Sequence, residues 1–193
     1  MNKFLHLIKT KGMKQFFTMA AMCGFFTAHA QKVSFSAGLG IFRESHESTR
    51  QLDDPEHRGT SVIAELHAAK NRHLMSVSFI YGVEFVLLSD AAVSFTEMNA
   101  MYGRYFPVNH VFQIEGLAGI GYFNIKDPRF YETDYYGNGY DAPYLRTSRV
   151  AFPLRVNFRF FPDSRFGFGI KTNYNINSFS KVLSGQLYGT FTF

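Results

Sequence analysis

The sequence has no tryptophan and only one cysteine, Cys23. A chain with a single cysteine forms no intramolecular disulfide. The residues before it, Ala20-Ala21-Met22, make a poor lipidation signal, because methionine is large where Gly or Ala is wanted. We therefore interpret Cys23 as a residue that is lost with a leader, which leaves a mature chain without cysteine.

Acidic residues are also missing from the start of the chain, where none precedes Glu44. The early bases are followed by an apolar run, 16–26, and by Ala28-His29-Ala30, which supplies the small residues that signal peptidase reads. The run is shorter than the roughly 20 residues that a helical anchor needs. We predict a cleaved signal peptide at 1–30 and one mature domain at 31–193, with translation starting at Met1 or Met13. The early bases are Lys3, Lys9, Lys11 and Lys14.

The net charge of +5 belongs largely to the leader. All fifteen acids but only sixteen of the twenty bases follow Ala30, so the mature chain carries +1. It contains no block of Lys and Arg that would mark a basic patch. A nucleic-acid partner is therefore not expected.

No stretch of 18 or more apolar residues follows the leader, which excludes helical membrane spans. Apolar residues instead alternate with polar ones, most clearly over 150–160. Successive side chains of a strand point to opposite faces, so this segment has one apolar and one polar face. The apolar face consists of Val150, Phe152, Leu154, Val156, Phe158 and Phe160.

The alternation recurs in eight segments, an even number. Short turns at 70–72, 107–109 and 162–164 separate some of them. Longer links at about 44–59 and 126–147, and shorter ones near 88–93 and 177–181, separate the others. Short turns at one end and longer loops at the other are typical of outer-membrane barrels. The clear segments are 33–41, 75–85, 112–122, 150–160, 166–176 and 183–193, and the weaker ones are 60–69 and 94–106.

The polar faces of these segments favour a membrane barrel over a soluble barrel or sandwich. They carry mainly Gly, Ser, Asn and Thr, whereas the outer surface of a soluble barrel is usually rich in Lys and Glu. Small residues suit the inside of an eight-stranded barrel, which side chains just fill. We predict an all-β fold, an eight-stranded antiparallel up-and-down transmembrane β-barrel. Aromatic residues expected at the turn-side interface are Tyr105, Phe112, Phe160, Phe166, Phe191 and Phe193.

The chain ends in Leu-Tyr-Gly-Thr-Phe-Thr-Phe, which resembles the C-terminal signal read by the outer-membrane assembly machinery. Together with 115–123 and 152–161, it is similar to the small OmpX and OmpA-barrel family, in the divergent form common in Bacteroidetes. The resemblance implies a location in the bacterial outer membrane. It also implies that Phe191 and Phe193 form the assembly signal. The expected partners are the assembly machinery, outer-membrane lipid and lipopolysaccharide.

Because that family includes lipid A-modifying enzymes, a catalytic pair has to be considered. The late strand at 171–177 has no histidine, whereas a deacylase of this shape has a His-x-Ser-Asn motif there. Without a base beside a hydroxyl, a nucleophile is not activated. We therefore expect no enzyme, no cofactor and no metal. The link at 44–58 offers imidazoles and carboxylates, which favours a solvated loop over a metal site because no ligand spacing is defined.

The link at 126–146 is rich in tyrosine and contains Gly137-Asn138-Gly139. Tyrosine supplies wide contact area at low entropy cost, as in binding loops. The alternative is that these rings pack on the barrel rim. The candidate contact residues are Tyr131, Tyr135, Tyr136, Tyr140 and Tyr144.

Charged residues of both signs fall on the predicted inward faces. A lone buried charge is costly, so we expect pairs that form a polar plug, with an ion path as the alternative. Glu115 and Arg155 are expected to pair, with Arg159 or Lys171 as the other choice, and inward Pro153 is expected at a bulge or beside a water. The set is Glu65, Glu84, Glu97, Glu115, Arg149, Arg155, Arg159 and Lys171.

The sequence thus predicts a non-enzymatic outer-membrane barrel with a structural or surface-interaction role and the 126–146 loop as its contact surface. The alternative is a narrow channel for small or apolar solutes.

The assembly signal can be tested by deleting Phe193. If the terminal aromatic completes the signal, the shortened chain should yield much less surface-assembled, heat-modifiable protein than wild type. Normal assembly of a chain that ends at Thr192 would contradict the assignment.

Overall fold

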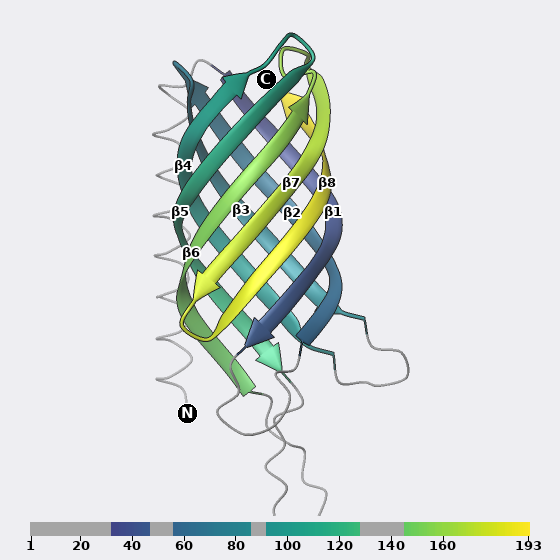
Figure 1. Cartoon of the computed structure of the whole chain (residues 1–193), viewed down its shortest axis with the longest axis vertical. Coiled ribbons are helices and arrows are strands. Elements are labelled where there is room, and N and C mark those ends of the chain that lie inside the picture. The colour runs from purple at the N-terminus through teal and green to yellow at the C-terminus, as the bar shows by residue number, and fades with distance from the viewer. Residues whose placement is uncertain (1–31, 47–55, 86–91, 128–144) are drawn as a thin grey trace, which may run out of the picture.

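The computed structural model describes residues 32–46, 56–85, 92–127 and 145–193. These residues form one closed barrel of eight antiparallel strands in sequence order, and the predicted fold class is confirmed (Figure 1). Among the described residues, no helix is long and apolar enough to cross a membrane. The strands are β1 (Lys32–His46), β2 (Glu56–Lys70), β3 (His73–Glu84), β4 (Ser94–Pro107), β5 (Phe112–Asp127), β6 (Leu145–Phe160), β7 (Phe166–Asn177) and β8 (Ser180–Thr192).

The strands are staggered, and the stagger fixes the width of the barrel. A row of paired residues that starts at Lys32 passes through Arg155 and Ser184 and reaches β1 again at Phe42, ten residues further along. Eight strands with such a shear tilt by roughly 35–45° and enclose an interior that side chains just fill. Inward side chains from opposite walls can therefore meet.

The two ends of the barrel differ, as Figure 1 shows: the three connections at the top, 71–72, 108–111 and 161–165, are all short turns. The strand ends that the longer connections join lie at the bottom, together with one short turn, 178–179, between β7 and β8. One turn uses Asn71 and Arg72, both with positive φ (50° and 68°). Asparagine tolerates this left-handed conformation better than most residues. In another turn, the Asn109 side chain accepts hydrogen bonds from the backbone N–H groups of Val111 and Phe112, both at 2.8 Å. By the rule for such barrels, the short-turn end faces the periplasm.

The outer face is apolar and the inner face largely polar. Leu39, Leu187 and Phe166 are about 70% exposed, although they are among the most hydrophobic side chains of the chain. Serines, asparagines and charged residues are buried instead. A soluble protein has the opposite arrangement, with apolar side chains inside and polar ones outside. An apolar outer face suits contact with lipid tails, so the strands are the membrane-spanning elements.

Aromatic rings collect at the short-turn end of the outer face. Phe112 lies 5.3 Å from Phe160 between ring centroids, and Phe160 lies 5.3 Å from Phe168. Phe191 contacts both Phe166 and Phe193, each at 5.1 Å. These rings form an interfacial girdle as predicted.

Tyr105 is an exception to the predicted girdle. It pairs directly with Glu115, which points inward, so Tyr105 also lies on the inner face. The prediction for this residue was wrong because β4 alternates without interruption from buried Glu97 to Tyr105.

Pro153 points inward, but the expected bulge is absent. Ala118 pairs with Leu154 and Gly121 with Ala151, so β5 and β6 keep one register across the proline. The pairing of β5 with β6 lacks only the two pairs between these positions. Pro153 still pairs with Asn175 of β7 on its other side.

The first long link is shorter than predicted, because β1 continues to His46 and β2 already begins at Glu56. Glu44 and His57 are therefore buried inward residues of strands and not part of a solvated loop. The remaining acids of this link, Glu47, Asp53 and Asp54, lie outside the described residues.

Candidate functional site in the barrel lumen

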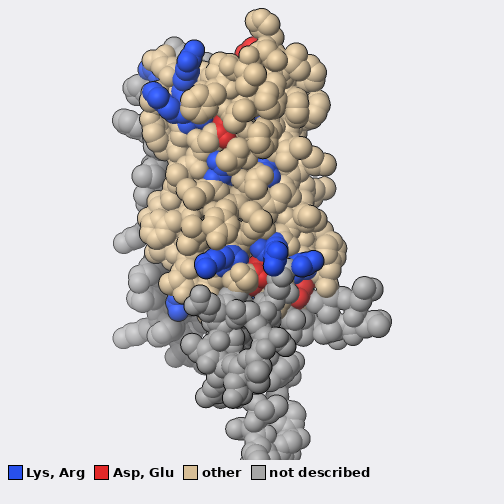
Figure 2. Space-filling view, viewed as in Figure 1, with Lys and Arg blue, Asp and Glu red and all other residues tan. Residues whose placement is uncertain are grey.

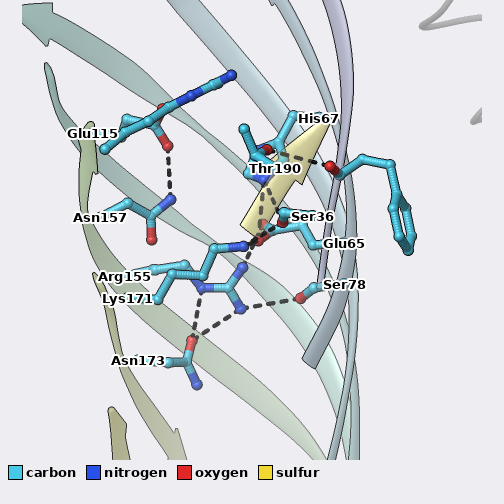
Figure 3. Close-up of polar contacts among 12 residues, drawn as sticks. Ser36, Glu65, His67, Ser78, Glu115, Arg155, Asn157, Lys171, Asn173 and Thr190 are labelled. Carbon is cyan, nitrogen blue, oxygen red and sulfur yellow. Dashed lines mark hydrogen bonds and ion pairs between the residues drawn. The ribbon is translucent and has the colours of Figure 1, made fainter. Parts of the chain in front are cut away.

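The centre of the lumen is a carboxylate held by two cations. Glu65 on β2 forms ion pairs with Arg155 from β6 and Lys171 from β7, one at each carboxylate oxygen (Figure 3). All three side chains are completely buried. A buried ion pair is stable only when its remaining hydrogen-bonding groups are also satisfied.

Neutral side chains supply those further hydrogen bonds. Arg155 donates through Nη2 to Ser78 Oγ (3.0 Å) and through Nε and Nη2 to Asn173 Oδ1 (3.3 and 3.2 Å). Lys171 Nζ donates to Ser36 Oγ at 2.6 Å and lies 4.2 Å from the centre of the Tyr188 ring. The network thus ties β1, β2, β3, β6, β7 and β8 together across the lumen.

Glu115 belongs to a second polar group nearer the periplasmic end. Its carboxylate accepts hydrogen bonds from Asn157 Nδ2 (2.7 Å) and Gln113 Nε2 (2.8 Å), and Arg159 Nη1 lies 3.9 Å away. The expected pair of Glu115 with Arg155 is therefore wrong, and Arg159, the other choice, is the neighbouring base. Glu115 is opposite Asn157, so Arg155 and Arg159 are both its diagonal neighbours. Arg155 pairs with Glu65 across the lumen instead, and Arg159 is the base that remains near Glu115.

Glu97 is the third buried carboxylate, and it is held by amides. It accepts hydrogen bonds from Asn99 Nδ2 (3.2 Å) and Asn173 Nδ2 (3.4 Å). Within the described part of the chain, no base lies within ion-pair distance of it. Asn173 also bonds Arg155, so one amide side chain connects Glu97 to the central network.

The other two predicted lumen residues lie at the loop end. Glu84 Oε1 is 3.0 Å from His57 Nδ1, and Glu44 Oε2 is 3.9 Å from His57 Nε2. Arg149 is exposed and donates to the carbonyl oxygen of Ser148 at 3.0 Å. The structure therefore places Glu84 in a separate group at the mouth and Arg149 outside the buried network.

An apolar layer lies between the central network and the mouth. On each contributing strand its residues are closer to the long connections than the polar network residues are. Phe95 packs edge-on against Phe42 (centroids 4.8 Å apart) and stacks on Phe123 (5.8 Å). The buried members are Phe42, Ile63, Ile80, Val93, Phe95, Phe123, Ile125, Ala151 and Val182.

Sequence reasoning missed this layer. Its signal was present, because the polar face of several strands is interrupted by a large apolar residue near the loop end. Several strands have such an interruption at a similar level, and together they form the layer. A smaller inward cluster, Leu74, Met101 and Leu117, completes the interior on the β3–β5 side.

The structure also corrects one premise about catalysis. Ser36 Oγ lies 3.3 Å from His67 Nε2, so a histidine does stand beside a hydroxyl. The same ring nitrogen is 3.2 Å from Glu65 Oε2, and Ser36 also accepts a hydrogen bond from Lys171. This serine is fully buried inside the network, where its hydroxyl serves the ion pairs.

No cluster of three or more metal-ligating side chains occurs within the described ranges. The tyrosines of the 126–146 link, Tyr131 to Tyr144, lie outside the described residues, since β5 ends at Asp127 and β6 begins at Leu145.

No protein-family model matches the chain, and no curated protein does. Several solved structures are similar to it. Ail, the attachment invasion locus protein of Yersinia pestis, has a TM-score of 0.56 at 20% identity, over 84% of this chain and 98% of that chain. Neisserial surface protein A has a TM-score of 0.56 at 10% identity, over 82% and 95%.

The N-terminal β-barrel domain of Pseudomonas aeruginosa OprF has a TM-score of 0.51 at 12% identity, over 86% of this chain and all of that chain (100%). Identities this low show the fold, which is that of the small eight-stranded outer-membrane barrels. With its apolar outer face, the barrel lies in the bacterial outer membrane.

The central network can be tested with a double-mutant cycle. Glu65→Gln strands two buried cations and should cost roughly 3–5 kcal/mol, measured as a lower urea midpoint for folding in lipid vesicles. Arg155→Met should cost less, because Lys171 still faces Glu65. The double variant should lose less than the sum, since one stranded charge is removed.

The matched control is Arg149→Met, which removes an exposed arginine from the same strand as Arg155 and should barely move the midpoint. Strictly additive losses in the cycle would mean that Glu65 and Arg155 do not interact.

Proposed function

We propose that the protein is a non-enzymatic outer-membrane barrel with a sealed interior, and that it has a structural or surface-interaction role. The observation that carries this proposal is the filling of the lumen by two layers of opposite chemistry. An ion that was accepted by the charged layer around Glu65 would next meet the apolar layer around Phe95. Moving a charge into such surroundings is strongly unfavourable, which argues against the narrow-channel alternative.

With the interior sealed, the remaining place for a function is the extracellular rim. Two like-charged pairs face outward there: Arg43 is directly opposite Arg58, and Lys126 is directly opposite Arg146. Like charges in direct cross-strand contact are destabilising, so an anion near them is favoured. Arg43, Arg58 and Lys126 also interact with other protein groups, but each pair still presents two bases. Figure 2 shows Lys and Arg near the loop end, with acidic side chains beside them, and a second group of bases near the short-turn end.

Lipopolysaccharide is the anion that fits this position. Its phosphates lie in the outer leaflet at the level where the strands end, and bases bind phosphate through charge-assisted hydrogen bonds. A protein of similar fold, Ail, has been solved in complex with the heparin analogue sucrose octasulfate, with a TM-score of 0.52 and 16% identity to this chain.

The 126–146 loop is the proposed contact surface beyond the rim. It joins β5 and β6, which with 16 residues each are the longest strands of the described barrel. Its tyrosines offer flat, amphipathic surfaces suited to sugar rings, such as those of the lipopolysaccharide core.

The sealed interior predicts the outcome of a conductance measurement. The purified barrel, inserted into a planar bilayer, should show no steady ohmic current. Stable, ion-selective openings would overturn the sealed interior and support the channel.

The rim predicts phosphate-dependent binding of lipopolysaccharide. Lys126→Gln/Arg146→Gln should weaken binding several-fold and reduce its salt dependence, because two bases are lost. Lys70→Gln, at the opposite end, is the control and should bind as wild type does. Replacing Tyr135, Tyr136 and Tyr140 with serine should weaken binding of complete lipopolysaccharide but not of lipid A, which lacks the core sugars. Equal binding by all variants, or unchanged binding of dephosphorylated lipid A, would contradict the proposal.

A further inference from the structure

The lipid-facing surface carries an open groove in its periplasmic half. The groove has a volume of about 810 Å³ and runs across the outer face of β4, β5, β6 and β7. Tyr102 and Phe106 form one wall, and Leu154 and Phe158 form the other. Gly116 and Ala118 of β5 form the floor between them.

The groove exists because β5 has almost no side chain where its neighbours have large ones. A Cβ atom added to Gly116 would meet nothing within 4 Å, so the space above this residue is open. Gly116 is therefore not required for close packing against other parts of the barrel. A glycine that no packing contact explains, between two aromatic walls, indicates room for something outside the chain.

The groove has a charged end and an apolar end. Arg104 and Phe106 are close to the turn after β4, near the periplasmic interface, whereas Leu154 and Tyr174 lie further toward the middle of the strands. A lipid molecule of the periplasmic leaflet has the same order, with its phosphate at the interface and its chains toward the bilayer centre.

Arg104 is placed to meet such a phosphate. It is exposed, and its two cross-strand neighbours are His73 on β3 and Gly116 on β5. Because Gly116 has no side chain, nothing from β5 blocks the guanidinium on the groove side. His73 Nδ1 is hydrogen-bonded to the Tyr102 hydroxyl; when that hydroxyl donates, the neutral ring carries its hydrogen on Nε2 and can donate to a phosphate oxygen.

A second hollow on the opposite part of the outer face serves as a comparison, because its lining carries no charge. It measures about 650 Å³ and is lined only by apolar residues and glycine, from β1, β2, β3 and β8. No base borders it. The combination of a groove with an arginine at its interfacial end occurs at β4–β7 and not at this second hollow.

We propose that the β4–β7 groove is a specific site for one glycerophospholipid of the periplasmic leaflet, with an acyl chain over Gly116 and the phosphate bound by Arg104. The site lies on the opposite half of the barrel from the lipopolysaccharide-binding rim and does not depend on it. The positive charge of Arg104 favours the lipid phosphate, and the apolar walls of the groove favour the acyl chain.

The test is lipid retention, measured by native mass spectrometry on the folded mature chain mixed with phosphatidylglycerol or with diacylglycerol. Wild type should retain one phosphatidylglycerol through detergent activation and should not retain diacylglycerol, which has no phosphate. Gly116→Leu, which fills the groove, should lose retention, and Arg104→Gln should reduce it several-fold. Heat-modifiability confirms that each variant is folded.

Two matched controls separate this site from general effects of substitution. Gly185→Leu is the same change at another outward glycine with open space above it, and Lys70→Gln removes a base from the same end of the barrel. Both should retain lipid as wild type does. Equal retention by all variants, or equal retention of diacylglycerol, would overturn the proposal. The proposal would also be overturned if wild type had the mass of a dimer and Gly116→Leu had the mass of a monomer. The groove would then bind a second copy of the protein.

Discussion

Inside a membrane every backbone N–H and C=O group must find its partner within the protein, because hydrocarbon offers none. This chain meets the requirement by pairing β1 with β8, so that no strand edge remains open. Closure with only eight strands makes the barrel narrow, and the inward side chains must then fill the interior. The charged network and the apolar layer are both consequences of that narrowness, and the sealed lumen that we propose rests on them.

Filling a narrow interior with charges works only when each charge is compensated. Glu65 faces two cations at once, and the surplus positive charge lies within reach of Glu97 through Asn173. The neutral Ser and Asn residues provide the remaining hydrogen bonds without adding charge. The apolar layer nearer the mouth differs in chemistry, because its buried side chains are hydrophobic and offer an ion no hydrogen bonds. An interior filled in this way favours a closed barrel over a conducting one.

The outer face is under a different constraint. It must be apolar everywhere that lipid tails reach, yet it need not be smooth. Gly116 leaves a hollow where most outward positions carry a bulky side chain, and Arg104 stands at its interfacial end. At the other end of the strands, the outward bases of β1, β2, β5 and β6 form the rim at which we propose that lipopolysaccharide binds. The two ends of the outer face therefore differ in chemistry.

The sequence by itself determined the fold, because period-two alternation is a local property: Val150 to Phe160 shows its two faces without any knowledge of other strands. It also identified most inward charges, since each is fixed by parity along its own strand. Tertiary structure alone decided which charges meet. Arg155 contacts Glu65 and not Glu115, and Glu97 is held by amides. Those choices depend on the register of each strand pair and on the stagger round the barrel, and a shift of one pleat, which leaves the alternation unchanged, replaces one partner with another.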